Sequence, residues 1–388
     1  MVKKFNLTKK ELIRTIIALA VLYVVICAVC YFLYVMENEH TVWEIVRFFG
    51  LNLLLIVVLG VYVYCVNIDA LKETRQLYAL SVIMVLGLAI YIVIQKFVSP
   101  YLVPYAFIAL TNGLVISKRS GFMSAFVVIM SMFFAQSMSV DSVTLDLFMP
   151  FFVGLCLSII SAFMLSRQRK RVKYFAVAII LSLSTFACNI LFALAGANPV
   201  DILMLSIYSL LSGFLSVALF WFAVPILDSI FNFVTDFRLA ELTATSAPLM
   251  KRMYEEAPGT FNHCLTVANY TEACANAISE NPYLARAAAY YHDIGKIKNP
   301  IYFKENQMDG HNPHDEITPE LSTALIKKHV SNGMLMAKEY HLPEKVSMYI
   351  QEHHGTMPIQ FFYSKAQKYT DGILEDTGFR YDGPTPSN

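Results

Sequence analysis

The chain has 388 residues, of which 56% are hydrophobic and only 15% are charged, against about 25% charged residues in an ordinary soluble domain. The net charge of +1 provides no strong field that would recruit a nucleic-acid polymer. Residues 12–226 are almost free of charge, whereas residues 237–388 have the mixture of a globular domain. We therefore expect an all-α protein, with a polytopic transmembrane helical bundle followed by a soluble domain.

The N-terminal segment 1–11 is basic and is followed by an apolar run over residues 12–35. A signal peptide has an apolar core of only about 7–15 residues. The run here is long enough to cross the hydrocarbon core of a bilayer. We interpret residues 12–35 as the first transmembrane anchor.

Further apolar runs predict a seven-helix transmembrane region within residues 43–226. The expected spans are 43–66, 76–95, 100–117, 121–139, 145–165, 173–195 and 201–224. The span at 100–117 is the weakest, because Pro100 and Pro104 interrupt its start. Together with the first anchor this makes eight spans, none of which has an ionisable residue at its middle. That pattern disfavours a transporter or channel and favours an anchor, an oligomerisation surface or a signal relay.

The loop charges predict the orientation of these spans. Basic residues gather on one side of the expected bundle, which the positive-inside rule assigns to the cytoplasm. An even number of spans leaves both termini on that side. The basic residues there are Lys3, Lys4, Lys9, Lys10, Arg14, Lys72, Arg75, Lys118, Arg119, Arg167, Arg169, Lys170, Arg171 and Lys173, and the opposite side carries Glu37, Glu39, Lys96, Asp141, Asn198 and Asp201.

Residues 227–257 are interpreted as a linker helix, with Leu239–Glu256 helical and Pro248 at a break or a first turn. The seven cysteines show neither a disulfide framework nor zinc-knuckle spacing. Cys27 and Cys30 have redox spacing but lie in an expected span, so we interpret them as small apolar residues.

The soluble domain places histidines at or near the ends of its expected helices. His263 is near the start of the helix 260–279, and the helix that begins at Pro282 ends in His292-Asp293. His329 lies on the helix 319–340, and His353-His354 follow the helix 343–352. Successive helical residues point about 100° apart, so His292 and Asp293 can address one cavity.

These residue types indicate a metal site. Imidazole and carboxylate groups suit iron, manganese or zinc, and two such ions about 3.5–4 Å apart can clamp a phosphoryl displacement. Asp293 could bridge the two ions, a water between them would be the nucleophile, and Lys296 could reach an anionic substrate group. From the residues alone, we expect metal-assisted hydrolysis of a phosphoester.

A string of motifs in this domain resembles the membrane-bound seven-transmembrane HD phosphodiesterases of the PgpH type. The resemblance covers nearly all of residues 237–388. The motifs are Glu255-Glu256-Ala257-Pro258-Gly259-Thr260, His263, His292-Asp293-Ile294-Gly295-Lys296, Glu305-Asn306-Gln307, Asn312-Pro313-His314-Asp315-Glu316, Glu352-His353-His354-Gly355-Thr356 and Phe379-Arg380-Tyr381 with Gly383-Pro384.

The resemblance implies an all-helical cytoplasmic HD domain, residues 258–388, that hydrolyses cyclic di-AMP to the linear dinucleotide pApA. Two divalent ions, iron or manganese, are implied as cofactors, with Lys296 neutralising phosphate charge. His263, His292 and Asp293 are implied as ligands of one ion, and Asp293, His329, His353 and His354 as ligands of the other. His314 and Asp315 are expected to be local structure or to support the ligands, and His311 and His341 to be surface residues.

The resemblance also implies a multi-pass protein of the bacterial cell membrane, in contact with lipid, with a homodimer left open. Family members carry a large extracellular domain after the first span, but here only about residues 36–42 fill that gap, so we expect its ligand-sensing function to be absent. The last metal ligand of the family is an aspartate in a later helix. Asp371, Asp376 and Asp382 do not match that motif, so we expect an HD domain that is incomplete at its C-terminal end.

Two alternatives remain open. The domain could be an impaired receptor or scaffold that binds a cyclic dinucleotide without turnover. It could also be an HD hydrolase that acts on another nucleotide phosphoester.

Overall fold

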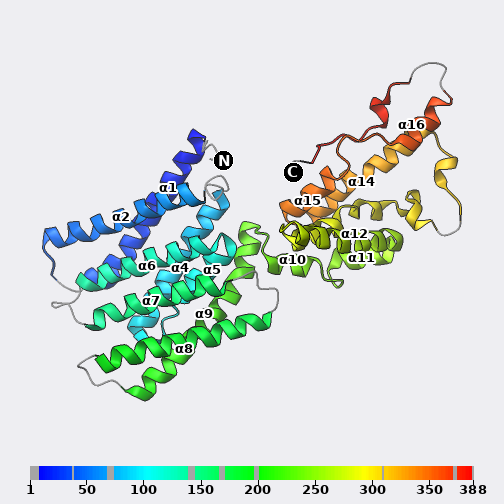
Figure 1. Cartoon of the computed structure of the whole chain (residues 1–388). Helices are drawn as coiled ribbons and strands as arrows, with labels where there is room; N and C mark the ends of the chain where they lie inside the picture. The colour runs from blue at the N-terminus through cyan, green and yellow to red at the C-terminus, as the bar shows by residue number, and fades with distance from the viewer. Residues whose placement is uncertain are drawn as a thin grey trace. The chain divides into compact units, whose positions relative to one another are not determined.

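The computed structural model describes residues 8–36, 39–67, 74–138, 145–165, 171–195, 201–307, 310–369 and 374–386. The chain divides into two compact units, Met1–Phe231 and Asn232–Asn388. Both are built from helices (Figure 1). In the described ranges the only β-type pairing is an isolated bridge between Pro358 and Arg380. The expectation of an all-α protein is confirmed.

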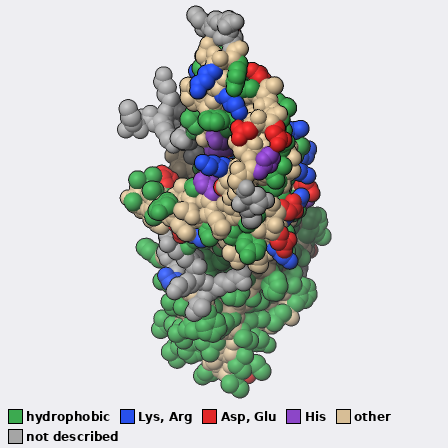
Figure 2. Space-filling view, turned by 90° about the vertical axis from the view of Figure 1, so that its right-hand side faces the viewer, with side chains coloured by type: hydrophobic (Ala, Val, Ile, Leu, Met, Phe, Trp, Pro, Cys, Tyr) green, Lys and Arg blue, Asp and Glu red, His purple; other side chains and the backbone are tan. Residues whose placement is uncertain are grey.

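The described part of the first unit contains seven helices that are long and apolar enough to cross a membrane. Their lipid-compatible side chains give this unit an almost entirely hydrophobic surface in Figure 2. The helices are α1 (Lys9–Cys30, continued by the π-helical turn η1, Tyr31–Val35), α2 (Val42–Val66), α4 (Thr74–Phe97), α6 (Lys118–Met138), α7 (Leu145–Met164), α8 (Arg171–Ala195) and α9 (Ile202–Phe231).

Capping boxes fix the starts of α1 and α2. The side chain of Thr8 accepts a hydrogen bond from the backbone of Glu11, whose carboxylate accepts one from the backbone of Thr8. Thr41 and Glu44 repeat this arrangement before α2. Each box satisfies N–H groups that a helix start would otherwise leave without partners.

The prediction of a spanning helix at 100–117 was wrong. This stretch forms a single 3₁₀ turn, η2 (Pro100–Leu102), and a ten-residue helix, α5 (Ala106–Val115). Ten residues rise only about 15 Å, half of a hydrocarbon core. The prolines that made this span the weakest prediction interrupt the helix. The described residues therefore contain seven spanning helices rather than eight.

The chain nevertheless passes through the bundle between α4 and α6. At the end of α4, Gln95 accepts a hydrogen bond from Tyr34, at the end of η1. About one turn earlier in α4, Tyr91 donates a hydrogen bond to the carbonyl of Tyr105, just before α5. The far end of α5 lies against the start of α6, where Gly121 approaches Gly113. Residues 98–115 thus return to the end where α6 begins, first through the 3₁₀ turn η2 and a short irregular stretch and then as a half-length helix.

The second unit begins with α10 (Asp236–Leu242) and α11 (Pro248–Glu256), so the expected linker helix is divided at Pro248, which takes the first turn of α11. Prolines also open three later helices, where a missing N–H costs nothing. The remaining helices are α12 (Pro258–Ala277), α13 (Pro282–Tyr291), α14 (Pro319–Glu339), α15 (Glu344–Glu352) and α16 (Gln360–Gln367), with 3₁₀ turns η3 (Ile294–Lys298), η4 (Pro300–Tyr302), η5 (Lys304–Asn306), η6 (Pro313–Asp315) and η7 (Asp376–Phe379).

A buried cluster of apolar side chains from α10 to α15 holds the second unit together. The hydroxyl of Tyr291 donates a hydrogen bond of 2.6 Å to the carbonyl of Leu242, which ties α13 to the end of α10. Gly295 of η3 packs directly on α14, because a Cβ there would lie 1.8 Å from the carbonyl oxygen of His329. This close approach brings the end of α13 against the middle of α14.

Several residues used for the orientation prediction lie outside the described residues. They are Lys3, Lys4, Glu37, Lys72, Asp141, Arg167, Arg169, Lys170 and Asn198, and Asp371 of the soluble domain is outside them as well.

The crossing of α5 and α6 leaves no room for a side chain at Gly121. A Cβ there would lie 2.3 Å from the carbonyl oxygen of Ala109 and 2.6 Å from the nitrogen of Gly113. We predict that Gly121→Ala destabilises the first unit by about 1–3 kcal/mol, because backbone must move. Gly50→Ala is the control, since nothing lies within 4 Å of its Cβ. Thermal unfolding in detergent should show a lowered Tm for Gly121→Ala alone; equal Tm values would contradict the close crossing.

Candidate metal centre

Four helices present the histidines of the candidate site. His292 is the C-cap of α13, and Asp293 follows it at the turn into η3. His353 is the C-cap of α15, and His354 comes next. His263 lies in the second turn of α12 and His329 in the middle of α14. The helices thus bring these side chains together around one point.

Asp293 occupies the middle of this arrangement and is only 3% exposed. Its Oδ1 lies 3.4 Å from Nε2 of His329 and 3.7 Å from Nε2 of His353. Its Oδ2 lies 3.1 Å from Nε2 of His292 and 3.8 Å from Nε2 of His263. The two carboxylate oxygens therefore face two different sets of imidazoles.

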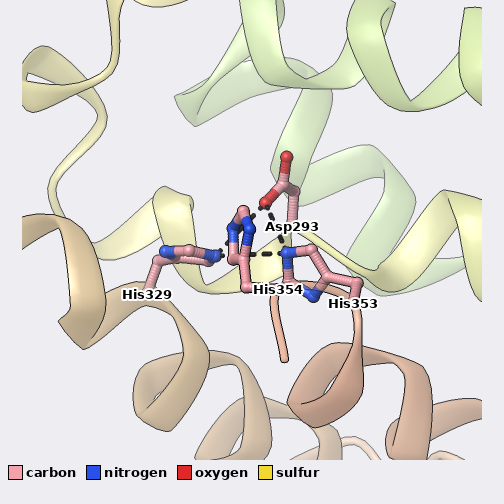
Figure 3. A group of neighbouring side chains, drawn as sticks. All are labelled: Asp293, His329, His353 and His354. Carbon is pink, nitrogen blue, oxygen red and sulfur yellow. Dashed lines mark hydrogen bonds and ion pairs between the residues drawn. The ribbon is translucent and has the colours of Figure 1, made fainter. Parts of the chain in front are cut away.

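The ligand atoms form two groups that share Asp293, and in each group they lie within 4.8 Å of one another. The three-residue group consists of His263, His292 and Asp293. The four-residue group consists of Asp293, His329, His353 and His354, whose side chains converge in Figure 3. These are the same two sets that the sequence resemblance implied.

Backbone carbonyls orient three of the imidazoles. Nδ1 of His292 lies 2.8 Å from the carbonyl of Ala289, and Nδ1 of His329 lies 2.6 Å from that of Ile326. Nδ1 of His353 makes the same contact at 3.0 Å with the preceding turn of α15. A carbonyl only accepts, so each Nδ1 carries a proton and each Nε2 is left to face Asp293.

His354 is oriented differently. Its ring stacks on the ring of Tyr381 at a centroid distance of 4.0 Å and an interplanar angle of 11°. On its other side it meets His353, also at 4.0 Å. Tyr381 stands in one of the sequence motifs, but the motif did not indicate a role in the site. Aromatic stacking depends on a contact between distant segments, which no local pattern reveals.

The residues fit a divalent ion in the four-residue group. Oδ1 of Asp293 is buried and has no hydrogen-bond partner, a costly state for a carboxylate oxygen unless a cation binds it. Nε2 of His329 lies 3.5 Å from Nε2 of His353. Two atoms that bind one ion at about 2.1 Å lie roughly 3.0–3.4 Å apart, close to the separations here.

The charges in the site suit cation binding. Burial alone would raise the pKa of Asp293, but the neighbouring imidazoles of His292 and His353 and the charge of Lys296 hold it well below its usual range. Burial lowers the pKa of His329 to about 4 and, reinforced by the charge of His353, that of His354 to about 3. These two imidazoles are therefore neutral at neutral pH, as metal ligands must be.

The pKa of His292 is raised, in contrast to those of His329 and His354. Burial would lower its pKa, but the hydrogen bond to Asp293 and the contact with Cys264 outweigh burial and raise it to about 10. The proton between His292 and Asp293 occupies the position that a cation would take. Metal binding in the three-residue group would therefore release a proton.

Lys296 is fixed against the carboxylate rather than free in solvent. Its side chain is 14% exposed, and Nζ lies 2.8 Å from Oδ2 of Asp293 and 2.8 Å from Oε1 of Glu305. Burial would lower the pKa of Lys296, but these two carboxylates raise it, so the ammonium stays charged. Glu305 stands in one of the sequence motifs, but the motif did not reveal this contact.

The remaining histidines of the domain lie outside both groups. His311 and His341 are exposed, as expected. His314 is buried, with Nε2 2.9 Å from the carbonyl of Tyr302 and its ring against Phe362. It supports the loop before α14 rather than the metal groups.

A cleft of about 940 Å³ adjoins the four-residue group. Its lining includes His354 and Tyr381 and three lysines of α14, Lys327, Lys328 and Lys338. Such a volume suits a ligand larger than a single phosphate.

The chain matches two family models. Residues 42–235, half of the chain, match the family described as "7TM receptor with intracellular HD hydrolase", and residues 260–380 match the HD domain. With its seven apolar helices, the protein is a multi-pass membrane protein.

Curated relatives carry the same name in two bacteria. The "Cyclic-di-AMP phosphodiesterase PgpH" of Listeria monocytogenes serotype 1/2a (strain 10403S) is 42% identical over 187 residues, 48% of this chain and 26% of that protein. Its counterpart in Bacillus subtilis (strain 168) is 40% identical over 191 residues, 49% of this chain and 27% of that protein. The chain thus covers about a quarter of the length of these relatives.

A solved structure of the L. monocytogenes PgpH HD domain in complex with cyclic-di-AMP is also similar. The two chains are 42% identical, and the match covers 37% of this chain and 67% of the solved chain with a TM-score of 0.36.

The shared position of Asp293 predicts how metal content responds to substitution. If each group holds one divalent ion, Asp293→Ala should remove both, because each group loses an oxygen ligand. His329→Ala should remove the ion of the four-residue group, and His263→Ala that of the three-residue group. Metal per chain, measured by mass spectrometry after manganese loading, checks this against His311→Ala, an exposed control. Two ions retained by Asp293→Ala would contradict the bridging arrangement.

Proposed function

The chain belongs to the family of 7TM receptors with an intracellular HD hydrolase, and on that basis we propose that it is a membrane-anchored phosphodiesterase that hydrolyses cyclic di-AMP to pApA. The observation that carries the proposal is the shared carboxylate. Asp293 directs one oxygen to each of two histidine groups. That arrangement suits a pair of ions held close together on one phosphodiester.

When bound, two divalent ions (iron or manganese) would supply Lewis acidity and a water-derived hydroxide as the nucleophile. The protein residues perform the supporting tasks. His263 and His292 would hold one ion, and His329, His353 and His354 the other, with Asp293 between them. Because their Nδ1 atoms are fixed by carbonyls, His292, His329 and His353 present Nε2 without reorganisation.

Lys296 would neutralise phosphate charge. A cyclic dinucleotide carries two phosphodiester charges, and the buried ammonium lies against the carboxylate that both groups share. A phosphate bound over Asp293 would therefore approach Lys296 in a region where water screens little. Substrate and ammonium would meet at the reacting end of the site.

The adjoining cleft supports a nucleotide substrate. It extends from His354 and Tyr381 along α14, and the three lysines that line it can attract a second phosphate. The relatives at 40–42% identity that are named cyclic-di-AMP phosphodiesterases make cyclic di-AMP the first substrate to test.

We further propose that both termini face the cytoplasm of the bacterial cell. Among the described residues, α1, α4 and α6 begin at one end of the first unit with Lys9, Arg75 and Lys118. The added passage by residues 98–115 returns the chain to that end before α6. α9 then finishes at the same end, since α6 to α9 form four successive passages.

The activity prediction concerns the His292-Asp293 pair. The full chain, purified in detergent with manganese, should release pApA from cyclic di-AMP. His292→Ala/Asp293→Ala should lower that rate by at least about a hundredfold, because ligands of both ions are lost. His311→Ala should leave it unchanged. Binding of cyclic di-AMP without turnover by the unaltered chain would favour the receptor alternative, and equal rates in chain and double variant would refute the metal mechanism.

The orientation prediction concerns the passage through residues 98–115. Single cysteines placed at Val98 and Lys118, in a chain without its native cysteines, should label from opposite sides of the membrane. Lys118→Cys should react with a membrane-impermeant maleimide only after permeabilisation of cells, and Val98→Cys in intact cells. Labelling of both from one side would contradict the passage.

A further inference from the structure

Glu305 stands in the motif Glu305-Asn306-Gln307, to which the function above assigns no task. We propose that Glu305 is a positioning residue that shares the ammonium of Lys296 with Asp293 and so weakens the competition of that ammonium with a divalent cation for Oδ2 of Asp293. The inference rests on the proposed metal-dependent function and concerns the three-residue group.

Lys296 and a cation would compete for the same atom. Nζ of Lys296 lies 2.8 Å from Oδ2 of Asp293, and that oxygen is also the one that faces His292 and His263. An ammonium held on Oδ2 alone would occupy this oxygen and repel a divalent ion. Glu305 offers a second carboxylate oxygen at an equal 2.8 Å.

Burial makes this competition matter. The side chain of Lys296 is 14% exposed and that of Glu305 is 30% exposed, so their charges are screened less than those of a surface pair. Beside a site for doubly charged ions, an uncompensated ammonium would weaken cation binding. The carboxylate of Glu305 compensates that charge while leaving Asp293 as the ligand.

The protein holds Glu305 firmly in place. Oγ1 of Thr260 donates a hydrogen bond of 3.2 Å to Oε1 of Glu305, and Nδ2 of Asn306 donates one of 2.9 Å to Oγ1 of Thr260. The backbone of Thr260 in turn donates to Oδ1 of Asn306 at 3.0 Å. A Cβ on Gly259 would lie 1.8 Å from the carbonyl oxygen of Glu305, so α12 packs directly on this turn. Glu305 is therefore attached to the helix that carries His263.

The test is a double-mutant cycle read out by cation binding rather than by turnover. Mn²⁺ is titrated calorimetrically into the full chain in detergent and into Glu305→Gln, Lys296→Met and the double variant. Glu305→Gln keeps an oxygen for Thr260 but loses its charge, and should weaken binding of one of two ions by at least about tenfold. Lys296→Met should bind at least as tightly as the unaltered chain. The Mn²⁺ affinity of the double variant should return to within about threefold of that of the unaltered chain.

The rescue separates positioning from a purely structural role. If Glu305 only anchored the turn to α12, removal of Lys296 would not restore binding, and a double variant as weak as Glu305→Gln would overturn the inference. Equal affinities in Glu305→Gln and the unaltered chain would overturn it as well. Glu316→Gln is the matched control, because Glu316 is an exposed acid whose carboxylate lies 3.5 Å from His311. Failure of the unaltered chain to bind Mn²⁺ at all would instead refute the proposed function.

Discussion

The second unit depends on the burial of one carboxylate. Placing a charged Asp293 at 3% exposure is costly unless its neighbours compensate. They do so from five elements, since α12, α13, α14 and α15 supply imidazoles and η3 supplies an ammonium. The close packing of Gly295 on the carbonyl of His329 makes this convergence possible, because any side chain at that position would separate η3 from α14. The geometry of the site therefore follows from backbone packing as much as from the histidines themselves.

The two ligand sets were implied by the family resemblance, and four of the six candidate ligands also share a physical feature that the sequence shows. His292 and Asp293 end one helix and His353 and His354 end another, and a side chain at a helix end can leave the helix surface and converge with others. What the sequence could not supply was the set of partners that adjust each ligand. The stacking of Tyr381 on His354, and the pairing of Lys296 with Glu305, join residues 27 and 9 positions apart through tertiary packing. No periodicity encodes such contacts. Tyr381 and Glu305 both stood in motifs, but a motif does not show which atoms of two distant residues face each other.

The first unit shows what hydropathy alone cannot predict about an apolar stretch. Composition located its apolar runs well, because transfer of side chains into lipid depends on local hydropathy. It could not distinguish a spanning helix from a half-length one. α5 is buried from Ala106 to Gly113, so its side chains are as apolar as those of a lipid-facing span. The irregular backbone of residues 103–105 before it is tolerated inside the bundle because protein groups replace water as partners. Tyr91 donates to the carbonyl of Tyr105, and Ser212 to that of Val103.

Both units thus place polar atoms in apolar surroundings, but the buried polar atoms differ in whether they receive hydrogen bonds. Along residues 103–105 the two carbonyls named above receive donors, and the passage is held by those contacts. At Asp293, one oxygen is shared among Lys296 and His292, while the other has imidazoles at 3.4 and 3.7 Å and no hydrogen bond. An oxygen surrounded by lone-pair-bearing nitrogens gains little from them and much from a cation between them. The feature that costs stability in the metal-free protein is therefore the same one that would give the site its affinity, so folding and metal loading of this unit should be linked.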